Sequence, residues 1–192
     1  MLRRIYDWTI LLAQTRHALW ALAAVAFVES SVFPIPPDVM LIPMVLALPR
    51  RAWLIASVCT LSSVAGGALG YVIGSGFFDL IGRPVLEFYG KMAEFDVFRE
   101  RFNEYGSWAV LMAGVTPFPY KVITITSGAT GLDFWVFMLS STVARALRFF
   151  VVAALLWKFG PPIRDFIDRR FGLVATGAIA LLFGGFLAVR YL

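Results

Sequence analysis

One segment of this chain, Ala52–Gly74, has 23 residues and no charged side chain. A helix needs about 20 apolar residues to cross the roughly 30 Å hydrocarbon core of a bilayer, so this segment predicts a membrane-spanning helix. A second uncharged segment, Leu173–Val189, is shorter, and a third, Phe134–Trp157, carries Arg145 and Arg148 in its middle. We expect all three segments to span the membrane, the third with one functional face.

The composition agrees with a membrane protein. Hydrophobic residues make up 60% of the 192 residues and charged residues 15%, whereas about 25% of a soluble domain is charged. These values exclude a soluble enzyme, a disordered tail and a nucleic-acid-binding module, so the net charge of +5 indicates orientation and contact with anionic headgroups. The chain has one cysteine, Cys59, which excludes an intrachain disulfide and a cysteine-based metal site.

Two further apolar stretches, 18–48 and 107–131, are each interrupted by closely spaced prolines. Proline lacks a backbone donor and its ring clashes inside a helix, so each stretch predicts two half-helices joined by a turn, as in a re-entrant hairpin. A pair of ordinary spanning helices with proline kinks is the alternative. The prolines are Pro34, Pro36 and Pro37 in the first turn and Pro117 and Pro119 in the second.

The spacing after the two turns repeats. Pro36 lies 16 residues before Ala52, and Pro119 lies 15 residues before Phe134. Because a re-entrant hairpin returns to its own side, one spanning helix separates the hairpins, and the second hairpin enters from the opposite face. The sequence therefore predicts an all-α integral membrane protein with an inverted repeat of hairpin plus spanning helix, which places broken helices near the midplane.

We expect residues 1–192 to form a single membrane domain whose amphipathic segments lie in the interface or pack on the spanning helices. With the N terminus inside, nine Lys and Arg residues lie on the cytoplasmic side and five on the other, which favours a cytoplasmic N terminus. The expected parts are an amphipathic N-terminal segment (1–17), a first hairpin-plus-helix unit (18–74), an amphipathic connector (75–106), a second hairpin-plus-helix unit (107–157), and an interfacial helix with the last spanning helix (158–192).

Five ionisable residues fall within the apolar segments. Each costs roughly 2.5–3.5 kcal/mol at a helix centre that faces lipid, so we expect them to pair or to face water. In one interpretation they form ion pairs that hold the hairpins together; in the other, the basic groups bind the phosphate of an anionic lipid and the carboxylates carry protons. The five are Glu29, Asp38, Lys121, Arg145 and Arg148.

Ser127 and Gly128 are a further candidate for phosphate binding. A glycine lets the backbone approach a ligand, and a half-helix terminus offers N–H groups to phosphate. The chain has no G-x-S-x-G, H-E-x-x-H or P-loop motif, and its single histidine, His17, cannot complete a triad. We therefore expect no enzyme activity, no metal and no cofactor.

The two turns carry a family resemblance. The residues are Glu29-x-x-x-Phe33-Pro34-x-Pro36-Pro37-Asp38, then Gly114-x-x-Pro117-x-Pro119-x-Lys121, followed by Ser127-Gly128. Over about residues 20–155 the chain thus resembles the DedA family, also called the SNARE-associated or VTT domain family, most closely its YqaA-like branch. The resemblance implies that Glu29 and Asp38 match the essential acidic pair of the family.

The resemblance also implies a function. Members are multi-pass proteins of the bacterial inner membrane that move undecaprenyl phosphate or phospholipids between leaflets, with dependence on the proton-motive force. The expected partners are anionic membrane lipids and protons, without nucleic acid, and a homo-oligomer is left open. A structural or assembly factor, and a proton or cation exchanger without lipid transport, remain alternatives.

Overall fold

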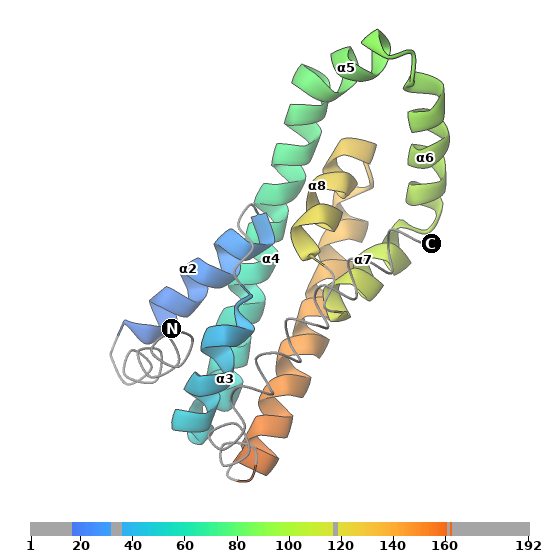
Figure 1. The fold of residues 1–192 in the computed structure, drawn as a ribbon. Helices are drawn as coiled ribbons and strands as arrows, with labels where there is room; N and C mark the ends of the chain where they lie inside the picture. The colour runs from blue at the N-terminus through green and yellow to red at the C-terminus, as the bar shows by residue number, and fades with distance from the viewer. Residues whose placement is uncertain (1–16, 32–35, 117–118, 161, 163–192) are drawn as a thin grey trace.

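The computed structural model describes residues 17–31, 36–116, 119–160 and 162, and these residues form helices and short turns without a β-strand. Most of the described chain is therefore α-helical, as the sequence predicts (Figure 1). The elements are α2 (Ala18–Ser31), α3 (Asp38–Ala47), the short helix η1 (Pro49–Arg51), α4 (Ala52–Phe77), the π-helical turn η2 (Phe78–Gly82), α5 (Arg83–Phe88), α6 (Met92–Glu104), α7 (Gly106–Val115), α8 (Tyr120–Thr130) and the long helix Phe134–Gly160.

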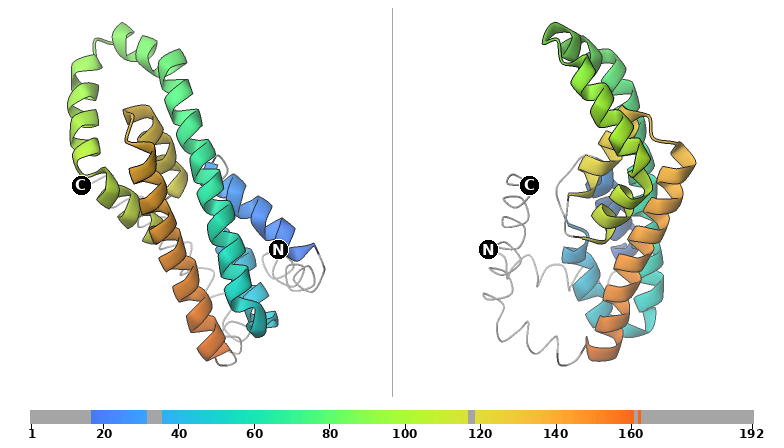
Figure 2. Two further views of the ribbon diagram at one scale, coloured as in Figure 1. Left: turned by 180° about the vertical axis from the view of Figure 1, so that it is seen from behind. Right: turned by 90° about the vertical axis from the view of Figure 1, so that its right-hand side faces the viewer.

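Two helices are long and apolar enough to cross a membrane. One is the continuous 40-residue helix Pro49–Phe88, which contains α4, and the other is the 27-residue long helix Phe134–Gly160. They lie side by side (Figure 2), and Trp53 of α4 stacks on Phe150 with 6.0 Å between ring centroids. Both segments that we expected to span in this part of the chain are thus long apolar helices, whereas the expected span Leu173–Val189 lies outside the described residues.

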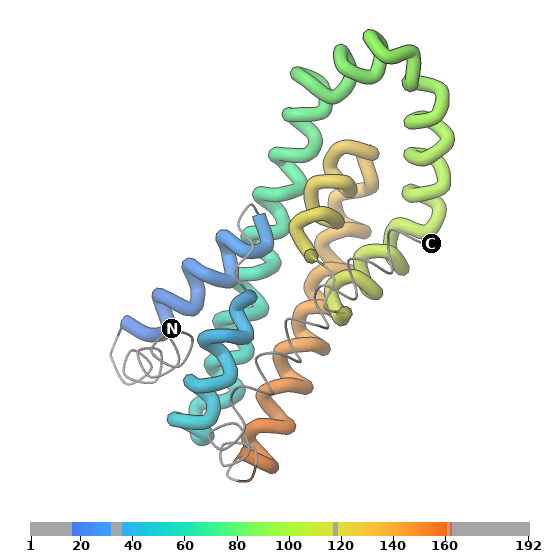
Figure 3. Tube along the Cα trace, in the orientation of Figure 1, coloured from blue at the N-terminus to red at the C-terminus, as the bar shows by residue number. Residues whose placement is uncertain are grey.

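The two proline-interrupted stretches each form a pair of short helices that run in opposite directions, α2 with α3 and α7 with α8 (Figures 1 and 3). Both second helices begin directly after a proline, α3 after Pro37 and α8 after Pro119. Proline suits a helix start, where its missing N–H costs nothing. Pro36 also lies in the first turn, while Pro34 and Pro117 lie outside the described residues.

Small residues of α4 allow both broken pairs to pack closely against it. A side chain at Gly66 would collide with the backbone of Phe27 in α2, and one at Gly74 with the backbone of Ile125 in α8. Small residues at four-residue steps permit such close helix approach in lipid. The end of α2 and the start of α8 are thereby brought together on one side of α4.

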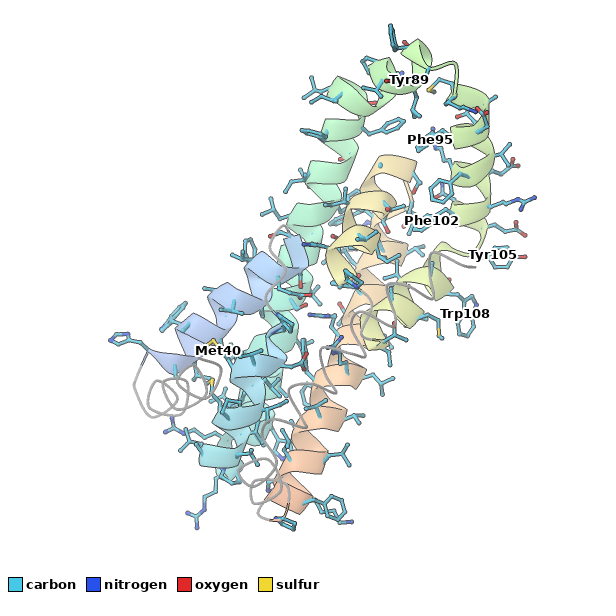
Figure 4. The ribbon with its side chains drawn as sticks, viewed as in Figure 1. Met40, Tyr89, Phe95, Phe102, Tyr105 and Trp108 are labelled. Carbon is cyan, nitrogen blue, oxygen red and sulfur yellow. The ribbon has the colours of Figure 1, made fainter. Side chains whose placement is uncertain are left out.

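The segment after α4 forms an arm, α5 and α6, that folds back toward α8 (Figure 3). Phe95 of α6 stacks on Phe78 at 4.5 Å between centroids, and Phe95 and Phe102 lie on the inner side of α6, whereas Tyr105 and Trp108 point away (Figure 4). Phe102 also packs against a buried cluster that includes Val110 and Phe137, so the expected amphipathic connector packs partly on the rest of the molecule.

A polar contact also holds the arm. Arg99 donates from Nε to the carbonyl oxygen of Thr130 at 2.8 Å, and Asn103 donates from Nδ2 to the same oxygen at 3.0 Å. Both side chains therefore satisfy a carbonyl group at the C-terminal end of α8, where helix carbonyls lack intrahelical partners. Arg99 is exposed in the structure and still reaches the end of α8 through this contact.

Candidate functional site

Four of the five ionisable residues in the apolar segments form two ion pairs. Arg145 Nη2 lies 2.9 Å from Glu29 Oε2, and Arg148 Nη2 lies 2.6 Å from Asp38 Oδ2. Both arginines come from the long helix, while Glu29 lies in the last turn of α2 and Asp38 begins α3. The expectation that these charges pair, because an unpaired charge in lipid is costly, is confirmed for these four residues.

The Arg145 pair is closed. The Arg145 side chain is 1% exposed and that of Glu29 is 14% exposed. The guanidinium lies between the rings of Tyr120 and Phe149, 4.6 Å from each centroid, and its Nε donates to Ser63 Oγ of α4 at 2.5 Å. Cation–π contact and charge-assisted hydrogen bonds are strongest where water is excluded, so this pair ties the long helix firmly to α2 and α4.

The Arg148 pair is more open and joins the two turns. Both side chains of this pair are 20% exposed. Arg148 Nη1 also donates to the carbonyl oxygen of Thr116, directly after α7, at 3.0 Å. One guanidinium therefore contacts the start of α3 and the end of α7, which belong to different broken pairs.

The broken pairs also meet directly. Thr124 Oγ1 of α8 lies 3.1 Å from the carbonyl oxygen of Ser30 in α2, and 2.9 Å from that of Lys121. Lys121 itself lies half-buried in the first turn of α8, which contains no acidic residue. A helix N terminus carries partial positive charge, so Lys121 and the start of α8 both add positive charge near the second turn, while Arg148 is paired with Asp38.

Ser127 and Gly128 lie about two turns beyond Lys121 in α8. They occupy the last turns of α8, and Gly128 is about 10 Å from Lys121 along the helix at 1.5 Å per residue. A side chain at Gly128 would collide with the backbone of Tyr71 and Ser75 in α4. The half-helix N terminus that we expected at Ser127 and Gly128 lies instead at Tyr120, and the glycine serves a close helix contact.

Several residues of the site were not identified from the sequence. They share one property, an uncharged side chain or carbonyl that surrounds the ion pairs or links the two broken helix pairs. The only signal for Ser63 is a hydroxyl in an apolar helix, and α4 contains several such hydroxyls, so the pattern does not single it out. The residues are Ser30, Ser63, Thr116, Tyr120, Thr124 and Phe149.

Comparison with known proteins identifies the family. Residues 35–158 match the model of the VTT domain, a range that contains Asp38, Lys121, Arg145 and Arg148, with Glu29 just before it. The chain is 36% identical over 168 residues to an uncharacterized protein of Haemophilus influenzae, covering 85% of this chain and 87% of that one.

A second relative comes from Histophilus somni and is also named as uncharacterized. It is 38% identical over 168 residues, again with 85% of this chain and 87% of the relative covered. No solved structure matches the chain. A family model that covers most of the chain, together with relatives of this identity and coverage, shows that the chain belongs to the VTT domain, or DedA, family of membrane proteins.

Proposed function

We propose that the protein moves a phosphate-bearing lipid, such as undecaprenyl phosphate or a phospholipid, between membrane leaflets without catalysing a chemical reaction. The observation that carries this proposal is Arg148, a partly exposed guanidinium that joins the two turns through Asp38 and Thr116. A guanidinium binds phosphate through two parallel N–H donors. A lipid phosphate at this position would replace Asp38 as the partner of Arg148.

The positions of tryptophans support a membrane placement with this site at depth. Trp135 and Trp157 on the long helix are 71% and 53% exposed and 22 residues apart, or about 33 Å at 1.5 Å per residue. This spacing matches the hydrocarbon thickness between the two aromatic belts of a bilayer. Arg145 is 10 residues from the first tryptophan and 12 from the second, near the midplane.

The lengths of the short helices support re-entrant hairpins in this membrane placement. α2, α3, α7 and α8 contain 14, 10, 10 and 11 residues, or about 15–21 Å each. Each helix is too short to cross, so each pair enters and returns to its own side. Because one spanning helix separates the pairs, they enter from opposite faces and form an inverted repeat.

The two ion pairs have different roles in this proposal. Arg145 is enclosed by protein groups, so Arg148 takes the lipid phosphate, with Lys121 in the first turn of α8 as a second cation. When phosphate binds Arg148, Asp38 is left without its partner, and an unpaired carboxylate at this depth is costly. Proton uptake by Asp38 therefore accompanies phosphate binding and couples lipid movement to the proton gradient.

The positions of the basic residues support one orientation. Arg50, Arg51 and Lys158 lie at the same end of the two spanning helices as Trp53 and Trp157. Cytoplasmic loops are enriched in Lys and Arg, so this end is placed in the cytoplasm. We propose a multi-pass protein of the bacterial inner membrane with a cytoplasmic N terminus.

Reconstitution in liposomes tests this function. The protein is expected to accelerate leaflet exchange of a labelled polyprenyl phosphate or phospholipid over empty vesicles. Arg148→Gln is expected to abolish the acceleration, whereas the matched variant Arg101→Gln, on the exposed face of α6, retains it. Wild-type vesicles that exchange lipid no faster than empty ones would refute the proposal.

A structural role is the second candidate function, and the closed Arg145 pair favours it. If the charges served only to hold the helices, Glu29→Gln and Arg148→Gln would lower expression and thermal stability together, and the wild type would not exchange lipid. Stable but inactive Arg148→Gln protein would favour transport instead.

A further inference from the structure

The Arg145 pair is part of a closed ring of four hydrogen bonds. Arg145 Nη2 donates directly to Glu29 Oε2 at 2.9 Å. Arg145 Nε contacts Ser63 Oγ at 2.5 Å, Ser63 Oγ contacts Ser30 Oγ at 2.6 Å, and Ser30 Oγ contacts the same Glu29 oxygen at 3.0 Å. The direct path and the hydroxyl path therefore join the same two charges.

The chemistry of the four groups fixes the direction of every bond in the ring. An arginine N–H can only donate and an ionised carboxylate can only accept. Ser63 therefore accepts from Arg145, and Ser30 donates to Glu29. Since Ser30 has one hydroxyl hydrogen and gives it to Glu29, Ser63 must donate its own hydrogen to Ser30.

This ring of hydrogen bonds joins three helices at one point. Ser30 and Glu29 belong to α2, Ser63 to α4 and Arg145 to the long helix. Ser30, Ser63 and Arg145 are almost fully buried, so the Nε–H of Arg145 would have no replacement acceptor from solvent if Ser63 were lost. Hydrogen bonds that share one direction also strengthen each other in a low-dielectric interior.

We propose that Ser63 is a positioning residue for transport. It orients the guanidinium of Arg145 toward Glu29 and keeps this pair closed as a fixed joint between α2, α4 and the long helix, while the Arg148–Asp38 pair opens to bind lipid. The inference rests on the proposed function and assigns a role in it to a residue that never touches the lipid.

Lipid exchange by Ser63 variants tests this role. Ser63→Ala is expected to lower the maximal exchange rate at least about tenfold, the effect of losing one charge-assisted hydrogen bond, with the half-saturating lipid concentration unchanged because Arg148 is intact. Ser63→Thr, which retains the hydroxyl, is expected to restore the rate. Failure of Ser63→Thr to restore the rate would overturn the proposal.

Thr60→Ala is the matched control. Thr60 is also buried in α4, one turn before Ser63, but its Oγ1 donates to Ala56 of the same helix at 2.8 Å. Its loss is expected to change the exchange rate less than about twofold, since its hydrogen bond stays within α4. Equal loss of activity in Thr60→Ala and Ser63→Ala would overturn the proposal.

A double-mutant cycle tests the ring of hydrogen bonds without a transport assay. Ser30→Ala and Ser63→Ala break the same chain of bonds, so the double variant is expected to lower Tm about as much as the more damaging single variant. Fully additive shifts in Tm would show that the two hydroxyl groups act independently, which would overturn the proposed ring of hydrogen bonds. Absence of lipid exchange by the wild type would instead overturn the proposed function, so the two failures are distinguishable.

Discussion

Neutralising the two carboxylates separately is expected to affect stability very unequally. Glu29→Gln and Asp38→Asn each replace an oxygen by a nitrogen and keep the shape of the side chain. Glu29 neutralises a guanidinium that is 1% exposed, whereas Asp38 neutralises one that is 20% exposed and also bonded to Thr116. The first change therefore strands a buried charge, and the second does so only in part.

The magnitudes follow from this difference in burial. Removing one partner of a buried ion pair costs about 3–5 kcal/mol, and a partly exposed pair is worth about 1 kcal/mol. In a chain of this size each kcal/mol shifts Tm by about 2–4 °C. Glu29→Gln is thus expected to lower Tm by about 6–20 °C and Asp38→Asn by about 2–4 °C.

Thermal unfolding in lipid nanodiscs, followed by tryptophan fluorescence, measures both shifts. Glu104→Gln, which neutralises an exposed carboxylate on α6, is the control and is expected to leave Tm unchanged. Equal shifts for the Glu29 and Asp38 variants, or a larger shift for Asp38→Asn, would refute the assignment of one fixed and one open pair.

Two further predictions concern the contacts that place the site. Gly128→Ala is expected to destabilise the protein by about 1–3 kcal/mol, because overpacking forces the backbones of α4 and α8 apart, whereas Gly76→Ala, with open space around it, should be tolerated; equal Tm values for both variants would contradict the close helix contact. Arg99→Ala removes one of two donors to the Thr130 carbonyl and is expected to speed amide hydrogen exchange in α6, with exposed Arg101→Ala as the control. Unchanged exchange in Arg99→Ala would show that α6 is held by its aromatic contacts.

The sequence predicts the elements of the fold well, because length and charge decide them. An uncharged stretch such as Ala52–Gly74 has few alternatives to a long helix, and the structure extends α4 to Phe77. The prolines decide where the broken helices begin, since Pro37 and Pro119 each directly precede a helix. The pairing of buried charges was also predictable, because an unpaired charge within the membrane is costly.

The roles of individual polar residues were less predictable, because they depend on how helices pack. Gly128 and Gly131 both stand near the end of α8, and the sequence does not distinguish a contact glycine from a terminal one. The structure places Gly131 in the left-handed conformation that ends the helix, with φ of 67°, and Gly128 against α4. The hydrogen bonds of Ser63 to Ser30 and Arg145 depend on how α2, α4 and the long helix pack together, which the sequence does not specify.

Selectivity of leaflet exchange for phosphate is the sharpest test of a phosphate site at Arg148. Vesicles containing the protein are given either a labelled phospholipid or a labelled neutral lipid of equal chain length, with wild type and Arg148→Gln compared. Faster exchange is expected for the phosphate-bearing lipid alone, and Arg148→Gln is expected to lose that acceleration. Equal acceleration of the neutral lipid, or an Arg148→Gln variant as active as the wild type, would contradict this expectation.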